Sequence, residues 1–139
     1  MAARSFELGT LRLLKGKTNA NTWAEFNTWI QTHVALEEAH IVFGTGGNIN
    51  RALKMRGSNQ TNTLSLYDLK ALEQDLSKES IEQRCEKYQL KPDRADVIVP
   101  ALQIYIAALE ALKQEAIVVP RIGLSDGVIY QLYFQNSTT

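Results

Sequence analysis

Two kinds of hydrophobic pattern alternate along the chain. Short runs of apolar residues, or of apolar residues alternating with polar ones, predict strands at residues 4–8, 41–43 and 116–119. Longer segments in which apolar residues recur every three or four positions predict helices. These segments cover residues 22–34, 48–55, 65–76, 80–90, 99–113 and, after a turn, part of 123–133. Residues 10–15 suit either a continued strand or a helical turn, and we favour a short helix. The chain is therefore expected to be richer in helix than in strand.

Local signals indicate where several of these helices begin and how deeply they are buried. Ser65 and Ser80 stand at expected N-caps, where a hydroxyl can accept a hydrogen bond from a helix amide. Pro100 is tolerated in the first turn if the regular helix starts near Val99, and a kink in a longer helix is the alternative. Apolar residues wrap most of that helix, so we expect it to be nearly fully buried at the centre of the domain. The aromatic stripe of the 22–34 helix is also expected in the core.

The fold class that follows is α/β, or α+β by content, with a small sheet of about three strands packed by several helices. At 139 residues the chain fits one domain, residues 1–139. A three-stranded sheet leaves an edge with unpaired backbone groups. We expect a segment missing from this chain, or a second copy of the chain, to cover that edge. The tail, residues 134–139, is expected to fray.

Composition narrows the class of partners. Lys plus Arg and Asp plus Glu both number 15, so the formal net charge is zero, and neither nucleic acid nor a membrane is an expected partner. Cys85 is the only cysteine, which excludes an internal disulfide, and His33 and His40 are the only histidines. No uninterrupted apolar run is long enough to span a bilayer. We expect a soluble, cytoplasmic protein.

The most informative stretch is His-Ile-Val-Phe-Gly-Thr-Gly-Gly-Asn-Ile-Asn-Arg at residues 40–51, which reads as an apolar strand, a glycine turn and a helix start. Gly44, Thr45, Gly46 and Gly47 make the turn a candidate anion site. Glycine lets a ligand approach the backbone, and the first amides of a helix have no internal partners. The stretch lacks the complete Gly-x-Gly-x-x-Gly pattern and a following Lys-Ser/Thr. An ordinary tight strand-to-helix turn is the other interpretation.

Arg94 and Asp96 stand between a proline turn and an almost wholly apolar helix. A charged side chain there is expected either to pair with a neighbouring group or to bind a ligand. In one interpretation Asp96 accepts hydrogen bonds from the helix amides and Arg94 forms a salt bridge nearby. In the other, the Arg94 guanidinium binds an anion. Arg51 and Lys54 could add positive charge one turn after the glycines, although a solvated helix face is the commoner arrangement for such residues.

The remaining polar residues form no obvious catalytic set. Glu37 and Glu38 precede His40, and a solvated helix end is favoured there over an acid–base pair. Cys85 lies on an amphipathic segment with no neighbouring histidine, so a buried structural thiol is the better interpretation. We assign no catalytic residue and no metal ligand to this chain.

Four motifs, taken in order, resemble a known family. They are Ser-Phe-Glu-Leu-Gly-Thr-Leu-Arg-Leu at 5–13, Phe-Gly-Thr-Gly-Gly-Asn-Ile at 43–49, Arg-Ala-Asp-Val-Ile-Val-Pro-Ala at 94–101 and Gly-Leu-Ser-Asp-Gly at 123–127. Over nearly its whole length the chain resembles the later half of the exopolyphosphatase and guanosine-pentaphosphate phosphatase (Ppx/GppA) family. Two departures are mild. Asn48 stands where that family commonly has threonine, and Ala101 follows a proline that glycine usually follows.

The resemblance implies part of the second actin-like (ribonuclease H-like) domain of a two-domain enzyme, in the group that includes actin, sugar kinases and the Hsp70 ATPase. Such an enzyme removes the terminal phosphate of polyphosphate or guanosine pentaphosphate with Mg²⁺ in the cleft between its domains. The family's Asp-x-Gly-Ser-Asn and Asp-x-Gly-Gly-Gly-Ser loops, and the glutamate base between them, have no counterpart here. The resemblance therefore implies a fragment of domain II that is inactive alone.

By position, Gly44, Thr45, Gly46 and Gly47 correspond to a loop on the phosphate-chain or nucleotide side of that cleft, and Arg94 to a residue that reaches the distal part of the ligand. The implied partners are polyphosphate or guanosine pentaphosphate, the missing N-terminal portion of the parent enzyme, and a second copy in a homodimer. The alternative function is a non-catalytic guanosine-polyphosphate or anion-binding module, or a self-associating structural one.

Overall fold

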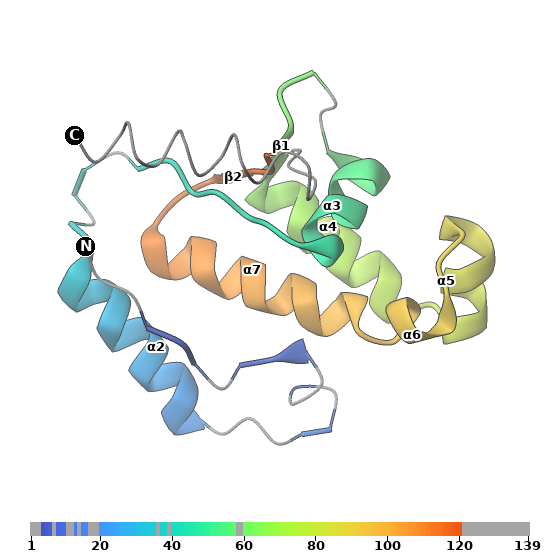
Figure 1. Cartoon of the computed structure of the whole chain (residues 1–139), viewed down its shortest axis with the longest axis horizontal. Coiled ribbons are helices and arrows are strands. Elements are labelled where there is room, and N and C mark those ends of the chain that lie inside the picture. The colour runs from blue at the N-terminus through green and yellow to red at the C-terminus, as the bar shows by residue number, and fades with distance from the viewer. Residues whose placement is uncertain are drawn as a thin grey trace, which may run out of the picture.

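The fold is mostly helical with a small antiparallel sheet. A computed structural model describes residues 4–6, 8–10, 13, 15–16, 20–35, 37–38, 40–57 and 60–120. Figure 1 shows α7 as the long central helix, with α4 alongside, α2 at one side, and α5 and α6 near the end where α7 begins. In chain order the elements are α2 (Ala20–His33), α3 (Gly47–Arg56), β1 (Thr63–Ser65), α4 (Leu66–Ser77), α5 (Ile81–Tyr88), α6 (Pro92–Ala95), α7 (Ile98–Leu112) and β2 (Ala116–Val118).

The sheet of the described residues contains only β1 and β2, which pair antiparallel with Leu64 opposite Ile117. The strand expected at 116–119 is confirmed, but the prediction of about three strands is wrong. Where residues 4–8 are described, they are not in a strand. An alternating pattern shows which face a strand would bury, but a strand forms only where a partner lies alongside.

Residues 41–43, expected as a buried strand, run beside β2 and form only an isolated parallel bridge between Phe43 and Val118. Val42 packs against the core, whereas the side chains of Ile41 and Phe43 are 71% and 62% exposed. The prediction of burial is therefore wrong for these two residues. Alternate side chains of an extended segment point to opposite faces, and no layer of described residues covers the outer face here.

The two helix starts expected at serine N-caps are confirmed, whereas the helix expected at 22–34 begins two residues earlier, at Ala20. The Ser65 hydroxyl accepts a hydrogen bond from the Asp68 amide at 3.0 Å. At α5, Ser80 and Gln83 form a capping box in which each side chain accepts from the other residue's backbone amide. The short helix α6 stands where the sequence predicted only a turn, with Pro92 in its first turn.

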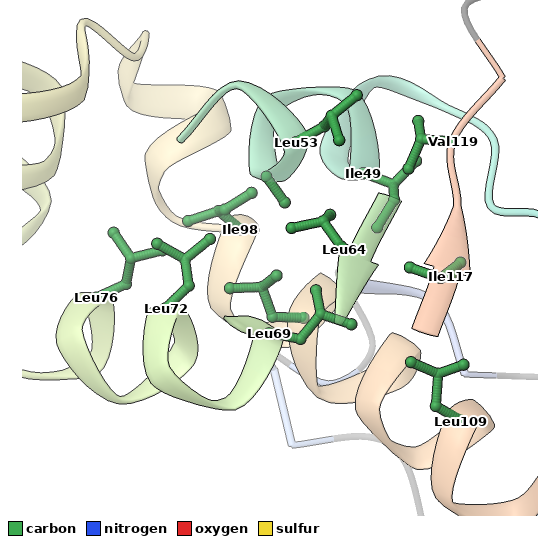
Figure 2. Packing of buried hydrophobic residues seen from close by; sticks show 12 residues of the cluster. Ile49, Leu53, Leu64, Leu69, Leu72, Leu76, Ile98, Leu109, Ile117 and Val119 are labelled. Carbon is green, nitrogen blue, oxygen red and sulfur yellow. The ribbon is translucent and has the colours of Figure 1, made fainter. Parts of the chain in front are cut away.

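The main core lies between α3, α4, α7 and the sheet. Figure 2 shows the buried side chains of these elements converging from the helices and from both strands. This core cluster consists of Ile49, Ala52, Leu53, Leu64, Leu69, Leu72, Leu76, Ile98, Leu102, Leu109, Ile117 and Val119. The inward residues expected of the 48–55 helix, Ile49, Ala52 and Leu53, are all in this cluster.

Helix α7 is central, as expected, but it is not nearly fully buried. Ile98, Leu102 and Leu109 face the core cluster, while Gln103 and Glu110 are exposed and most of its other apolar residues are only partly covered. Taken together, α6 and α7 (Pro92–Leu112) are long and apolar enough to cross a membrane by length and composition alone. Their packing on α4, α3 and α2 is that of the core helix of a globular domain.

The aromatic residues of α2 form a separate cluster rather than part of the core. Phe26 and Trp29 pack edge-on against Phe6, with ring centroids 5.3 Å and 6.1 Å away, and Ile30 is the buried residue of this helix. The prediction that the aromatics lie in the core is wrong, because α2 covers α7 from one side only. The elements expected at 123–133 and the tail at 134–139 lie outside the described residues.

Candidate functional site

Residues 44–47, the glycine turn, connect the extended segment beside β2 to the first residue of α3. Gly46 is the N-cap of α3, with φ 114° and ψ 172°, a conformation that is essentially restricted to glycine. It offers no side chain to cap the helix. Among the described residues, nothing accepts a hydrogen bond from the amides of Gly47 and Asn48. Two backbone donors are therefore free at the positive end of the helix dipole.

The three glycines of this turn serve different purposes. A Cβ on buried Gly44 would lie 2.6 Å from Ile117 Cδ1 and 3.3 Å from Ile49 Cγ1, so this glycine is required by core packing. A Cβ on Gly46 would meet no atom within 4 Å, and its backbone conformation is what demands glycine. At Gly47 the nearest atom to a Cβ would be Arg51 Nη1 at 2.7 Å. Exposed Thr45 lies between the first two.

Arg51 folds its guanidinium back over the glycine turn. The side chain is partly buried, and its Nη1 has no hydrogen-bond acceptor among the described residues. A guanidinium beside the positive end of a helix is electrostatically unfavourable unless an anion lies between them. The sequence favoured a solvated helix face for Arg51 and Lys54. That interpretation holds for Lys54, which is exposed, but is wrong for Arg51.

The four-residue spacing between Gly47 and Arg51 could have identified Arg51 as a residue of this turn. Residues four apart on a helix lie on one face, and side chains point towards the N-terminus, so Arg51 is placed to reach over Gly47. Asn48, the family departure, also has a buried Oδ1 with no described partner, but this oxygen is an acceptor and cannot donate to an anion.

Tyr105, on α7, packs against the core cluster close to the start of α3. Burial raises the pKa of the Tyr105 hydroxyl above its ordinary value of 10.0, and the nearby backbone amide of Ile49, the third amide of α3, partly offsets this rise. Sequence analysis missed this residue because it lies 56 positions after Ile49.

The raised pKa predicts a stability change at high pH. Neutral Tyr105 contributes fully below pH 10.0, the unfolded value, and its contribution is lost as the pH rises through the higher folded value. Tyr105→Phe cannot titrate, so the free energy of unfolding of the wild type should fall relative to this variant between about pH 9 and pH 11. Urea unfolding followed by circular dichroism at each pH measures the difference. Tyr67→Phe on exposed α4 surface is the control, and parallel curves for wild type and Tyr105→Phe would contradict the assignment.

Arg94 lies on α6, which packs on α5 and α7, and its side chain is exposed. No described hydrogen bond or ion pair joins it to the glycine turn or to Asp96. The interpretation of Asp96 as an N-cap is wrong, because Val97 is the N-cap of α7 and no side chain caps that helix. Asp96 instead ends α6, and its buried Oδ1 has no described partner. An anion at Arg94 stays a prediction.

The described residues hold no group of three or more His, Cys, Asp or Glu side chains that could bind a metal ion. The ring of His40 lies 2.6 Å from the Ala35 carbonyl through Nε2, so it contacts backbone rather than Glu37 or Glu38. Cys85 is partly buried on α5. The described residues therefore bring together unpaired backbone amides and a guanidinium at one helix start, which makes this turn a candidate anion site.

Comparison with known proteins identifies the family of this chain. The sequence profile of the Ppx/GppA phosphatase family matches residues 20–135. The chain belongs to this family, which comprises exopolyphosphatase and GppA hydrolases. No match is found among curated proteins.

Several solved structures share the fold. A Ppx/GppA family member from Aquifex aeolicus has a TM-score of 0.68 at 18% identity, covering 98% of this chain and 50% of its own. The type II variant of the Aquifex aeolicus Ppx/GppA phosphatase has a TM-score of 0.66 at 19% identity, with 93% and 48% covered. An exopolyphosphatase from Cytophaga hutchinsonii has a TM-score of 0.62 at 19% identity, also with 93% and 48% covered. The chain spans about half the length of these structures.

Proposed function

We propose that this chain is part of a phosphoanhydride hydrolase that releases terminal phosphate from inorganic polyphosphate or guanosine pentaphosphate. In this proposal it is the later portion of the second, actin-like domain and contributes one wall of the cleft. Family membership and the half-length match to the solved structures support the proposal. The chain alone would then bind the phosphate chain without cleaving it.

The observation that carries the proposal is the set of unpaired donors at the start of α3. The amides of Gly47 and Asn48 and the Arg51 Nη1 have no described acceptors, and all belong to the same turn of helix. A linear polyphosphate offers closely spaced anionic oxygens, which can accept from amides and a guanidinium together. Arg94 would contact a more distant part of the same ligand.

The metal implied by the family finds no ligand set among the described residues. A hard cation such as Mg²⁺ is usually held by carboxylates and by substrate phosphates. In the proposed enzyme the protein ligands and the base that activates water would come from the rest of the fold. In this proposal, the described residues of this chain hold and orient the phosphate chain.

Removing the Arg51 guanidinium tests this site. Arg51→Ala should weaken binding of guanosine pentaphosphate or inorganic polyphosphate to the 139-residue chain by at least about ten-fold, because a charge-assisted hydrogen bond contributes about 1.5–3 kcal/mol. Isothermal titration calorimetry measures the dissociation constant. Lys54→Ala removes the same charge from the same helix at an exposed position, so it is the matched control and should change affinity much less.

Two further measurements sharpen this test. Gly47→Ala places a methyl group 2.7 Å from Arg51 Nη1, so it should displace the guanidinium and weaken binding while leaving the helix intact. If Arg51→Ala and Lys54→Ala lowered the affinity equally, the loss would be explained by net charge alone, and this would count against the site. Phosphate release by the purified chain with Mg²⁺ would refute the proposal that it is inactive alone.

A further inference from the structure

Arg84, on α5, joins the ends of two other helices. Its Nε donates a hydrogen bond to the Leu76 carbonyl in the last turn of α4 at 2.9 Å, and its Nη1 donates to the carbonyl of Ala95, the last residue of α6, at 2.8 Å. We propose that Arg84 is a positioning residue: by holding α6, it sets where the neighbouring Arg94 presents its guanidinium to a phosphate chain. The proposal rests on the proposed function for the ligand of Arg94.

Helix α6 needs an external connection to keep its orientation. It is a single turn of four residues, and a helix this short is not stable by its own backbone hydrogen bonds. Ala95 is its only buried residue, and α5, on which it packs, has no fully buried residue. Figure 1 shows both helices near the end where α7 begins. Two hydrogen bonds therefore matter more for placing α6 than they would for a helix with a wide buried face.

A guanidinium suits this connection. The last carbonyls of a helix have no intrahelical donors and lie at the negative end of the helix dipole, so a cation is favourable there. The planar fork of arginine can donate to two carbonyls at once, which a single ammonium on a flexible stem does less well. Arg84 is partly buried, and Leu76, at one end of the connection, is fully buried in the core cluster. Arg84 therefore ties α6 to the packed core of the domain.

Arg94 is the residue of α6 that is free to bind a ligand. Its side chain is exposed, and no hydrogen bond or ion pair holds it among the residues that the structure describes. Its backbone is fixed, because its amide donates to the Lys91 carbonyl at 2.9 Å and the next residue is the one that Arg84 holds. A guanidinium on a fixed backbone loses less conformational freedom when an anion binds. Movement of α6 would displace it from the ligand.

The test compares Arg84→Lys with the wild-type 139-residue chain. Lysine keeps the positive charge and loses the fork, so a weaker affinity cannot come from net charge. We expect faster hydrogen exchange at the Arg94 and Ala95 amides, unchanged exchange at the amide of buried Leu102, and about ten-fold weaker binding of linear inorganic polyphosphate. Nuclear magnetic resonance and isothermal titration calorimetry measure these effects. Lys87→Ala, at an exposed position of α5, is the control and should change neither.

A double variant separates positioning from a general loss of stability. In the Arg94→Ala background, Arg84→Lys should have no further effect on polyphosphate affinity, because Arg84 acts on the ligand only through Arg94. A merely structural role would weaken binding by the same factor in both backgrounds. It would also speed hydrogen exchange at the Leu102 amide in the core.

Three results would overturn the positioning role. They are wild-type affinity and exchange in Arg84→Lys, additive losses in the double variant, and an Arg94→Ala variant that binds polyphosphate as tightly as the wild type. Failure of the proposed function has a different signature, which is a wild-type chain that binds no polyphosphate. In that case the exchange of the α6 amides alone decides about Arg84: faster exchange in Arg84→Lys would keep its hold on α6, and unchanged exchange would reject it.

Discussion

Replacing Leu69 with alanine is expected to lower the free energy of unfolding by about 2–5 kcal/mol. Leu69 is fully buried in the core cluster, where α4 packs on α7 and the sheet. Alanine removes the apolar contacts of the side chain and leaves a cavity that the rigid surroundings fill only in part. Domains are typically stable by about 5–15 kcal/mol, so this single change would remove a large fraction of the total.

Urea unfolding followed by circular dichroism at neutral pH measures the Leu69→Ala effect. Tyr67→Ala is the matched control, because it lies two residues earlier on the same helix with its side chain 77% exposed. Its effect should stay within about 0.5 kcal/mol. Similar losses in the two variants would mean that the α4–α7 contact isn't the centre of the core.

Gly44→Ala is expected to destabilise the protein by about 1–3 kcal/mol through overpacking. The added Cβ would approach Ile117 Cδ1 to 2.6 Å and Cγ1 to 3.2 Å. Ile117 and Ile49 are themselves buried in the core cluster, so neither side chain can swing into solvent to make room. The measurement is again urea unfolding. Gly9→Ala is the control, because a Cβ there meets no atom within 4 Å.

A second-site change identifies the collision directly. Ile117→Val removes Cδ1, the atom nearest to the new methyl group, and should by itself cost about 0.5–1.5 kcal/mol. If the collision is the cause, the double variant Gly44→Ala/Ile117→Val should lose clearly less stability than the sum of the single variants. Additive losses would instead point to backbone strain at Gly44. Binding of polyphosphate by the folded fraction should change little, which separates this packing glycine from Gly47.

The candidate site was only partly visible in the sequence. The glycine-rich strand-to-helix pattern predicted the turn and the unpaired amides, because both follow from local backbone geometry. It did not separate Gly44, which makes room for Ile117 from the sheet, from Gly46, which supplies a positive φ. It also gave no reason to prefer Arg51 to Lys54. The choice depends on which side chain folds back over the turn, and tertiary packing decides that.

In the fold, too, local features were predictable from the sequence, and features that depend on distant residues were not. Ser65 and Ser80 marked helix starts correctly, because a cap is a contact between residues three apart in the chain. Strand β1 was not predicted, since three residues with no strong pattern become a strand only by pairing with β2 more than fifty positions later. Ile41 and Phe43 were predicted to be buried from their apolar character alone. Burial also requires a covering layer, which the described part of the chain does not supply over them.

By itself, the sequence determined the local elements of this protein, from the helix caps to the glycine turn, and its order of motifs identified the family. These properties depend on neighbouring residues, or on a pattern read along the chain. Only the tertiary structure decided which glycine is required by core packing, which cationic side chain lies over the helix start, that Tyr105 of α7 lies near the Ile49 amide, and which sheet edge is left open. Each of these depends on residues brought together from distant positions, whose contacts are set by packing of the whole domain rather than by any local pattern.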